Sequence, residues 1–318
     1  MLKNYDIMKK QCANTLLMVR PANFGYNPET ADNNVFQTNN DSLSIREIAD
    51  RAMKEFDELL SRLKAASIEV VVIEDSVQPK KTDAVFPNNW FTTHDDGRII
   101  LYPMYSPNRR LERRTDIIDY LEESYEVSEV KSYTSNEDKG VILEGTGSMI
   151  IDRPNKIIYA CLSQRTDQRL LDKLSAELGG YEVIGFVAVD DQDVPYYHTN
   201  VIMTLGDDLA IICLESIADP TERARVEEKL KSTGKVIVDI SRSQVLKYCG
   251  NMLQVNNTKG EQYMVMSQSA RDNLTPSQIS QIESYVTILS SPIDIIEEYG
   301  GGSARCMLAE LFLAPKSH

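Results

Sequence analysis

Residues 148–189, SMIIDRPNKIIYACLSQRTDQRLLDKLSAELGGYEVIGFVAV, contain the pattern that decides the predicted fold. Two apolar runs at 148–152 and 157–161 flank the turn sequence Arg153-Pro154-Asn155-Lys156, which predicts a β-hairpin. A polar link at 162–166 leads into residues 167–178, where apolar residues recur at helical spacing. Residues 181–189 are again rich in apolar and β-branched residues. The stretch therefore predicts a unit of strand, turn, strand, helix and strand.

The same unit recurs along the chain, at roughly 50 to 60 residues per repeat, a period typical of radial or stacked arrays. Hairpins are predicted at 90–102, 201–214 and 252–266, helices at 112–121, 222–231 and 276–284, and closing strands at 125–130, 235–240 and 286–289.

A fifth unit is divided between the two ends of the chain. The strand at 307–313 is predicted to pair with the strand at 15–19, which precedes the helix at 44–63 and the strand at 68–73. Such a pairing closes a ring and removes open sheet edges. We therefore predict an α/β fold, a five-bladed β/α propeller of repeated ββαβ units. An ordinary mixed α/β sheet is the alternative, and the hairpins argue against a purely parallel sheet.

The repeats occupy nearly all of the chain, so we predict one catalytic domain over residues 1–318. Residues 1–14 are polar and are predicted to form a loosely held N-terminal arm. Residues 22–40 are rich in Asn, Pro and Gly, which predicts a loop rather than a regular element. Loops of this length in compact domains are usually functional, and the sequence leaves open whether this one covers a site.

The composition limits the class of function. A net charge of −14 argues against nucleic acid as a partner. No apolar stretch is long enough to span a bilayer and the N-terminus lacks a signal-peptide pattern, so we expect a cytoplasmic protein with no membrane partner. Five cysteines without paired spacing fit a reducing compartment. With only three histidines and no zinc-type spacing, we expect no metal or organic cofactor.

Four of the five units carry a chemically versatile residue just before their first strand. These residues are Asn88-Asn89, Glu144, His198 and Cys306. Equivalent positions in a ring of repeats converge on its axis, so a nucleophile, a base and a carboxylate would meet at one end of a channel. Each residue also has a simpler interpretation: a turn, a surface acid, a structural histidine and a buried cysteine.

Local context favours chemistry at three positions. Cys306 follows Gly300-Gly301-Gly302, and a thiol on a glycine-shaped turn with backbone N–H groups nearby is a plausible nucleophile. Glu144 stands between an apolar run and a glycine turn, where it would bind a cationic or amide-like substrate or orient a histidine. Arg165 would clamp a substrate carboxylate, unless it is a solvated charge.

At these residues the chain resembles the pentein superfamily of guanidino-group-modifying enzymes. That superfamily includes arginine deiminases, dimethylarginine dimethylaminohydrolases, succinylarginine dihydrolases and amidinotransferases. The most specific matches are Gly-Gly-Gly-Ser-Ala-Arg-Cys306-Met, Leu-Glu144-Gly-Thr-Gly, His198-Thr-Asn and Leu-Ser-Gln-Arg165-Thr-Asp-Gln. The chain is most similar to the bacterial citrulline-utilisation hydrolases. The resemblance implies Cys306 as nucleophile, His198 as general acid and base, and Glu144 as the carboxylate that holds the substrate's nitrogens. It further implies Arg165 on the substrate α-carboxylate and Asp83 near its α-amine.

The chain departs from the arginine deiminases at its candidate substrate-binding residues. Those enzymes usually carry acids where this chain has Asn88-Asn89 and Asn200. A guanidinium cation favours carboxylates, whereas a neutral ureido group favours amides, which donate as well as accept. The amides therefore favour citrulline as substrate, with ornithine, ammonia and carbon dioxide as products.

Other activities stay open at this point. Succinylarginine dihydrolases also use an Asn pair, so an arginine deiminase or dihydrolase activity is one alternative. An amidinotransferase is another, and a non-catalytic binding protein of the same superfamily is a third. Arg109 and Arg110 receive no role, and the oligomeric state is undecided, with a homodimer as one option.

Overall fold

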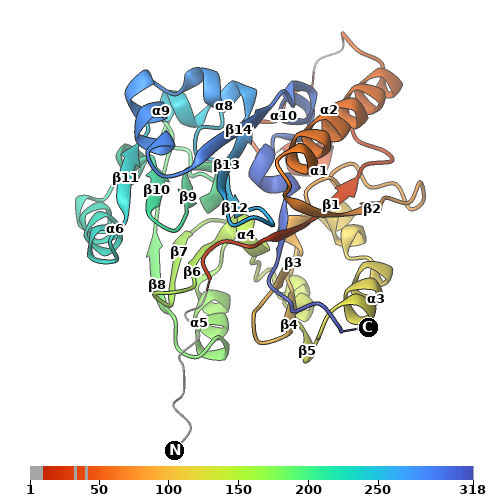
Figure 1. Cartoon of the computed structure of the whole chain (residues 1–318), viewed down its shortest axis with the longest axis horizontal. Helices are drawn as coiled ribbons and strands as arrows, with labels where there is room; N and C mark the ends of the chain where they lie inside the picture. Colours follow the sequence, from red (N-terminus) through yellow and green to blue (C-terminus); the bar gives the residue numbers. More distant parts are fainter. Residues whose placement is uncertain (1–9, 32–33, 40–41, 318) are drawn as a thin grey trace, which may run out of the picture.

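The computed structural model describes residues 10–31, 34–39 and 42–317 (Figure 1). In these residues the strands form five small sheets of three strands each. Written in hydrogen-bonded order, the sheets are β15 (Ala309–Leu311), β1 (Thr15–Arg20) and β2 (Glu69–Glu74); β3 (Phe91–Thr93), β4 (Arg98–Leu101) and β5 (Glu129–Ser132); β6 (Ile150–Asp152), β7 (Ile157–Cys161) and β8 (Glu182–Phe186); β9 (Met203–Leu205), β10 (Leu209–Ile212) and β11 (Val236–Asp239); and β12 (Leu253–Asn256), β13 (Gln262–Ser267) and β14 (Thr287–Ser291).

Each sheet has the same pairing pattern. Its middle strand runs antiparallel to one neighbour and parallel to the other. The antiparallel pair is a hairpin in four sheets, and a helical crossover leads to the parallel strand, as parallel pairing requires. The repeat of strand, turn, strand, helix and strand is therefore confirmed, within a mixed α/β fold.

The two ends of the chain meet in the fifth sheet. β1 pairs antiparallel with β15, with Leu16 opposite Glu310, and parallel with β2, with Leu16 opposite Val70. The predicted pairing of the last strand with the first is confirmed. It gives both edges of β1 a partner and leaves no row of open backbone groups on that strand.

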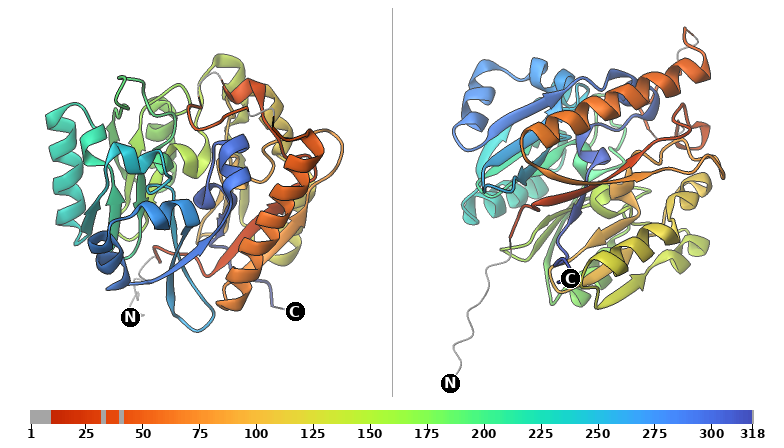
Figure 2. Two further views of the ribbon diagram at one scale, coloured as in Figure 1. Left: turned by 90° about the horizontal axis from the view of Figure 1, so that it is seen from above. Right: turned by 45° about the vertical axis from the view of Figure 1, so that its right-hand side comes forward.

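The longer helices lie around the outside of the molecule and the sheets lie inside them (Figures 1 and 2). The α-helices are α1 (Pro28–Ala31), α2 (Ile45–Ala65), α3 (Thr115–Ser124), α4 (Gly145–Ser148), α5 (Gln168–Glu177), α6 (Pro220–Ser232), α7 (Arg242–Val245), α8 (Gln268–Asn273), α9 (Pro276–Glu283) and α10 (Asp294–Gly300). The 3-10 helices are η1 (Pro87–Asn89), η2 (Pro107–Glu112), η3 (Thr134–Lys139), η4 (Thr199–Val201), η5 (Leu214–Ser216) and η6 (Ala304–Met307). No helix in the described ranges is long and apolar enough to cross a membrane.

Helix α2 shows how the sequence pattern becomes packing. Ser44 caps its N-terminus and exchanges hydrogen bonds with Glu47, a capping box. The helix buries one face, including Ile48, Phe56 and Leu63, against β2, β14 and α10. A side chain as large as that of Phe56 contributes about 2 kcal/mol by such burial. Ile45, in the first turn of the helix, is 72% exposed.

Several boundaries differ from prediction for reasons of packing. The helix predicted at 112–121 begins at Thr115, because Glu112 is buried in an ion pair with Arg109 that closes η2. The strand predicted at 307–313 shortens to β15, and Cys306 lies in η6 rather than at a strand end. The predicted loop at 22–40 contains the short helix α1.

The N-terminal segment also differs from the predicted loose arm. Residues 1–9 of that arm lie outside the described residues, but Gln11, Cys12 and Ala13 are buried. The Gln11 side-chain amide donates to the Ile151 carbonyl at 3.0 Å and accepts from the Arg153 N–H at 3.0 Å. These bonds hold residue 11 against β6, although the polar composition of residues 1–14 suggested a loosely held arm.

Candidate active site

The segments that precede the first strands of the sheets meet in the middle of the molecule. α4 contacts both η1 and η4, and η1 contacts η6. Beside them lies a cavity of about 20 Å³, which η1 and η6 line through Asn89 and Cys306. Five residues proposed from the sequence line it: Asp83, Asn89, Arg165, His198 and Cys306. The structure therefore brings together side chains that are separated by more than 200 residues in the chain, such as Asp83 and Cys306.

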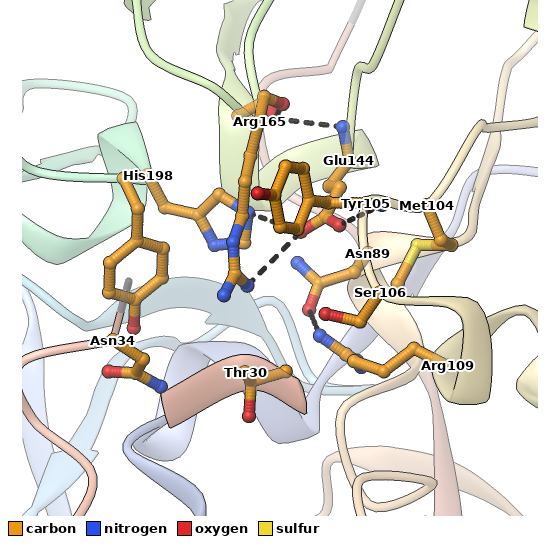
Figure 3. Close-up of polar contacts among 12 residues, drawn as sticks. Thr30, Asn34, Asn89, Met104, Tyr105, Ser106, Arg109, Glu144, Arg165 and His198 are labelled. Atoms are coloured by element: carbon orange, nitrogen blue, oxygen red, sulfur yellow. Dashed lines mark hydrogen bonds and ion pairs between the residues drawn. The ribbon is translucent and has the colours of Figure 1, made fainter. Parts of the chain in front are cut away.

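Glu144 and His198 form a buried pair beside the cavity. His198 Nε2 lies 2.7 Å from Glu144 Oε2, and Glu144 Oε1 accepts the Tyr105 backbone N–H at 2.8 Å (Figure 3). Since a carboxylate only accepts, Nε2 carries the proton and Nδ1 is the basic nitrogen. Both carboxylate oxygens are thus occupied by the protein. Two roles were inferred for Glu144 from its sequence context, binding of the substrate and orientation of a histidine. This geometry fits the second role.

The charges of this pair follow from burial and from its neighbours. Burial lowers the pKa of His198 to about 4, although the hydrogen bond that His198 donates to Glu144 acts in the opposite direction. Burial alone would raise the pKa of Glu144, but the Arg165 guanidinium and His198 outweigh it and lower that pKa. At neutral pH the imidazole is therefore neutral and the carboxylate is ionised, a pair suited to accept a proton.

We expect an NMR titration of the imidazole protons to place the midpoint of His198 near pH 4. Its neutral form should persist throughout the interval from about pH 4 to 6.5, where an exposed histidine becomes protonated. Only three histidines contribute signals, and the His198→Asn variant identifies the relevant one. Circular dichroism at each pH checks that the protein remains folded. A midpoint at or above 6.5 would contradict the burial argument.

Cys306 is held by two amide side chains. The Nδ2 atoms of Asn200 and Asn251 lie 3.3 and 3.4 Å from its sulfur. Asn200 was proposed from the sequence as a substrate-binding residue, and here it contacts the thiol instead. Asn251 was missed, although it immediately precedes the strand pair of the fourth unit, as Glu144 and His198 do in theirs. The positional rule applied to the other units was sufficient to find it.

Asn89 is oriented by an arginine that the sequence left without a role. Arg109 donates to Asn89 Oδ1 at 3.0 Å, and it also pairs with Glu112 at 2.8 Å. A guanidinium only donates, so the Asn89 carbonyl must face Arg109 and its Nδ2 must face away. In Figure 3 that nitrogen points toward the side of the site formed by His198 and Arg165. This buried nitrogen has no hydrogen-bond partner among the described residues.

Asn88 and the glycines of α4 shape the site rather than line it. Asn88 Nδ2 donates to Thr146 Oγ1 at 3.3 Å, so this amide of the predicted pair is directed into α4. At Gly147 a Cβ would lie 2.7 Å from the His198 ring. Any side chain there would displace the imidazole, which explains why this position is glycine.

Arg165 lies beside the Glu144–His198 pair. One of its terminal nitrogens, Nη1, is 3.5 Å from Glu144 Oε2, and its guanidinium carbon is 4.7 Å from the ring centroid of Tyr197. The side chain is 2% exposed. Arg165 therefore faces the cavity, as a carboxylate clamp must, while it is also paired with Glu144.

The described parts of the loop at 22–40 cover the cavity. Thr30 and Asn34 line it, and Asn34 donates to the Gly300 carbonyl at 3.3 Å. Asn27, also in this loop, donates to Asp83 Oδ2 at 2.6 Å. This bond fixes Asp83, the residue proposed to bind the substrate α-amine. In the described part of the chain, no group of three or more His, Cys, Asp or Glu side chains is arranged to hold a metal ion.

Comparison with known proteins extends the geometric argument to the whole chain. The sequence model of a family described as N,N dimethylarginine dimethylhydrolase, eukaryotic, matches residues 20–313. No curated protein sequence matches the chain.

Three solved structures show the same fold at low sequence identity. ArgZ, an arginine dihydrolase of the ornithine–ammonia cycle in cyanobacteria, has a TM-score of 0.72 and 17% identity over 93% of this chain and 40% of its own. Its N-terminal domain with bound substrate has a TM-score of 0.71 and 17% identity, over 93% of this chain and 98% of that domain. A dimethylarginine dimethylaminohydrolase, crystallised as an adduct with 4-chloro-2-hydroxymethylpyridine, has a TM-score of 0.64 and 14% identity, over 94% and 100%. The present chain thus spans 40% of full-length ArgZ.

The family match includes every residue that forms the cavity, from Thr30 to Cys306. The resemblance inferred from four short motifs is thereby confirmed over nearly the full length. This chain belongs to the N,N dimethylarginine dimethylhydrolase family, within the pentein superfamily of enzymes that hydrolyse or otherwise modify guanidino groups.

Proposed function

We propose that this family member is a cysteine hydrolase that cleaves citrulline to ornithine, ammonia and carbon dioxide. The family places it among hydrolases of C–N bonds in guanidino compounds. The choice of a ureido substrate within that class rests on the polar atoms that face the cavity.

The single observation that carries this choice is the unpaired Nδ2 donor of Asn89. A buried donor without a partner is costly unless a ligand supplies an acceptor. A guanidinium group has only donors, whereas a ureido group has a carbonyl oxygen. Since Arg109 prevents the Asn89 amide from turning round, the free N–H selects the ureido oxygen.

The first half of the proposed reaction forms a covalent intermediate. His198 accepts the proton of the Cys306 thiol, and the sulfur bonds to the ureido carbon. The C=O electron pair moves to oxygen, where the Asn89 N–H stabilises the developing charge. As the tetrahedral species collapses, the C–N bond breaks and His198 returns its proton to the departing nitrogen. Ammonia leaves and a thiocarbamate on Cys306 remains.

The second half releases ornithine. His198 takes a proton from water, the resulting hydroxide attacks the thiocarbamate carbon, and the C–S bond breaks to restore the thiol. The ornithine carbamate so formed loses carbon dioxide. Glu144 stabilises the imidazolium in both halves through its 2.7 Å bond to Nε2. Arg165 is proposed for the substrate α-carboxylate and Asp83 for its α-amine.

Substrate binding requires movement around the cavity, because about 20 Å³ accommodates roughly one water molecule. The described parts of the loop at 22–40 lie across it through Asn34 and through Thr38, whose N–H donates to the Glu298 carbonyl at 2.8 Å. Displacing this loop and Arg165 together would open the site from that side.

The main alternative is arginine dihydrolysis, the activity of ArgZ. Such an enzyme hydrolyses a guanidino group and then the resulting ureido group, so it shares the second half of the chemistry above. Release of ornithine and ammonia from arginine, citrulline, agmatine and N-acylated arginines separates these activities. We expect ornithine from citrulline and none from arginine. Ornithine from both would indicate a dihydrolase, and citrulline from arginine without ornithine from citrulline would overturn the proposal.

Replacing Asn89 by aspartate is expected to lower kcat/KM for citrulline about 100-fold, the usual effect of removing one oxyanion donor. The carboxylate would still accept from Arg109, so the local packing is retained while the N–H is lost. Asn136→Asp is the matched control and should retain full activity, because Asn136 is half-buried in η3, where its amide donates to the Tyr133 carbonyl at 2.7 Å, and does not line the cavity. If Asn89→Asp left citrulline turnover unchanged, the argument from the unpaired donor would be wrong.

For the molecule as a whole, we infer that the five sheets form one closed five-bladed propeller. The β1–β15 pairing and the contacts of β15 with β3, β6 with β9 and β9 with β12 support this arrangement. The five unpaired, buried cysteines suit a reducing cytoplasm.

A further inference from the structure

We propose that Asn251 is a positioning residue that holds the Cys306 sulfur for attack. The inference rests on the proposed function only in taking Cys306 as the nucleophile. It concerns a residue that neither the sequence motifs nor the mechanism above employs.

The orientation of the Asn251 amide is determined by its backbone partners. Its Oδ1 accepts the Arg305 N–H at 3.1 Å, and its Nδ2 donates to the Asn200 carbonyl at 2.9 Å. A backbone N–H only donates and a backbone carbonyl only accepts, so the amide cannot be turned round without losing both bonds. Asn251 is 2% exposed, which makes such a loss costly.

This fixed amide presents both of its polar atoms to the thiol. The second N–H of Nδ2 faces the Cys306 sulfur at 3.4 Å, and Oδ1 lies 3.6 Å from it. The neutral thiol can donate to Oδ1, and the thiolate formed when the proton leaves can accept from Nδ2. Asn251 can therefore form a hydrogen bond with the sulfur in both of its protonation states. Because the amide is neutral, it adds no charge that would compete with Arg165 for the substrate.

Asn200 is the second donor, but it is less constrained. Its Nδ2 lies 3.3 Å from the sulfur, while its Oδ1 has no hydrogen-bond partner among the described residues. No hydrogen bond from the described residues to that oxygen thus fixes the direction of the Asn200 amide. Asn251 is the donor whose direction the fold itself determines, since it links the backbones of the third and fifth units at the nucleophile.

The Asn251→Asp variant keeps the backbone bond from the Arg305 N–H and removes both N–H contacts of Nδ2, to the Asn200 carbonyl and to the sulfur. The iodoacetamide reaction of Cys306 is the readout that reports on the sulfur itself. Asn251→Ala removes the bond from the Arg305 N–H as well. The matched control is Asn257→Ala, since Asn257 is equally buried and bonds the Ala66 carbonyl at the outer turn of the same hairpin. That control should lower thermal stability without changing kcat.

We expect both Asn251 variants to lower kcat about 100-fold with KM changed less than about threefold, as removal of a donor to the reacting group does. We also expect alkylation of Cys306 by iodoacetamide at pH 7.5, followed by mass spectrometry without substrate, to slow by about 10-fold or more, because the thiolate loses a donor.

Near-normal kcat and alkylation in a folded Asn251→Asp protein would overturn the proposal and leave Asn251 as backbone support. Reduced kcat with a normal alkylation rate would also contradict it. If neither citrulline nor arginine were turned over by the wild type, the function proposed above would fail while the alkylation rates still decide the role of Asn251.

Discussion

Replacing Cys306 by alanine is expected to abolish turnover, with kcat lowered by about 10⁴-fold or more, while the protein stays folded. Among the described residues that line the cavity, Cys306 is the one whose nucleophilic atom lies between two amide donors. The thiol is small, and the groups around it are held by bonds to one another, so removing it leaves the site in place. Steady-state release of ammonia and ornithine measures the effect.

The control for this experiment is Cys249→Ala. Cys249 is also buried, but its sulfur contacts the Ala270 carbonyl at 3.3 Å, away from the cavity. That variant should lose some stability and keep its kcat. Mass spectrometry of wild type mixed with substrate and quenched in acid should show an adduct on Cys306 alone. Full turnover by folded Cys306→Ala would exclude covalent catalysis at this residue.

The second large effect is expected at Glu144, where glutamine should lower kcat by about 10⁴-fold, as loss of the carboxylate partner of a catalytic histidine typically does. Glutamine has nearly the same shape but no charge. The carboxylate raises the pKa of His198 against burial, so its removal leaves the imidazole a weaker base. The direction of this change in the pKa of His198 can be tested by NMR. The titration midpoint of His198 should move to a lower pH in the Glu144→Gln variant.

Glu137 provides a closely matched control. Its Oε1 accepts the Met104 N–H at 2.8 Å, just as Glu144 accepts the next N–H along the chain, and it pairs with Arg113 at 2.6 Å. Glu137 has no contact with His198. Glu137→Gln should therefore reduce stability and leave kcat within about twofold of wild type. Equal losses in both variants would show that Glu144 acts through packing rather than through the histidine.

Some of the site could be located from the sequence because it depends on position within a repeat. Glu144, His198 and Cys306 each precede the first strand of a unit, and the β/α repeat brings such positions together whatever the loops between them do. Local periodicity was enough to recognise the repeat, since each strand and helix is short and carries its own apolar pattern. The same rule would have found Asn251.

Other features depend on contacts that no local pattern records. The role of Arg109 follows from a buried ion pair with Glu112 and from the direction of the Asn89 amide, which only a three-dimensional arrangement defines. The burial of Gln11 depends on its hydrogen bonds with the Ile151 carbonyl and the Arg153 N–H, which lie more than 100 residues away in the sequence. Polar residues in a sequence look alike whether they end in solvent or in a satisfied internal hydrogen bond.

The amino-acid sequence by itself determined the repeat, the pairing of the terminal strands and the family, because these depend on spacing and on residue type. Only the tertiary structure decided the direction in which each polar group of the site points. It turned Glu144 toward His198, directed the Asn89 nitrogen to the cavity and placed two amides on the sulfur. Those directions follow from partners on other units, since a hydrogen bond orients a side chain only when donor and acceptor meet in space.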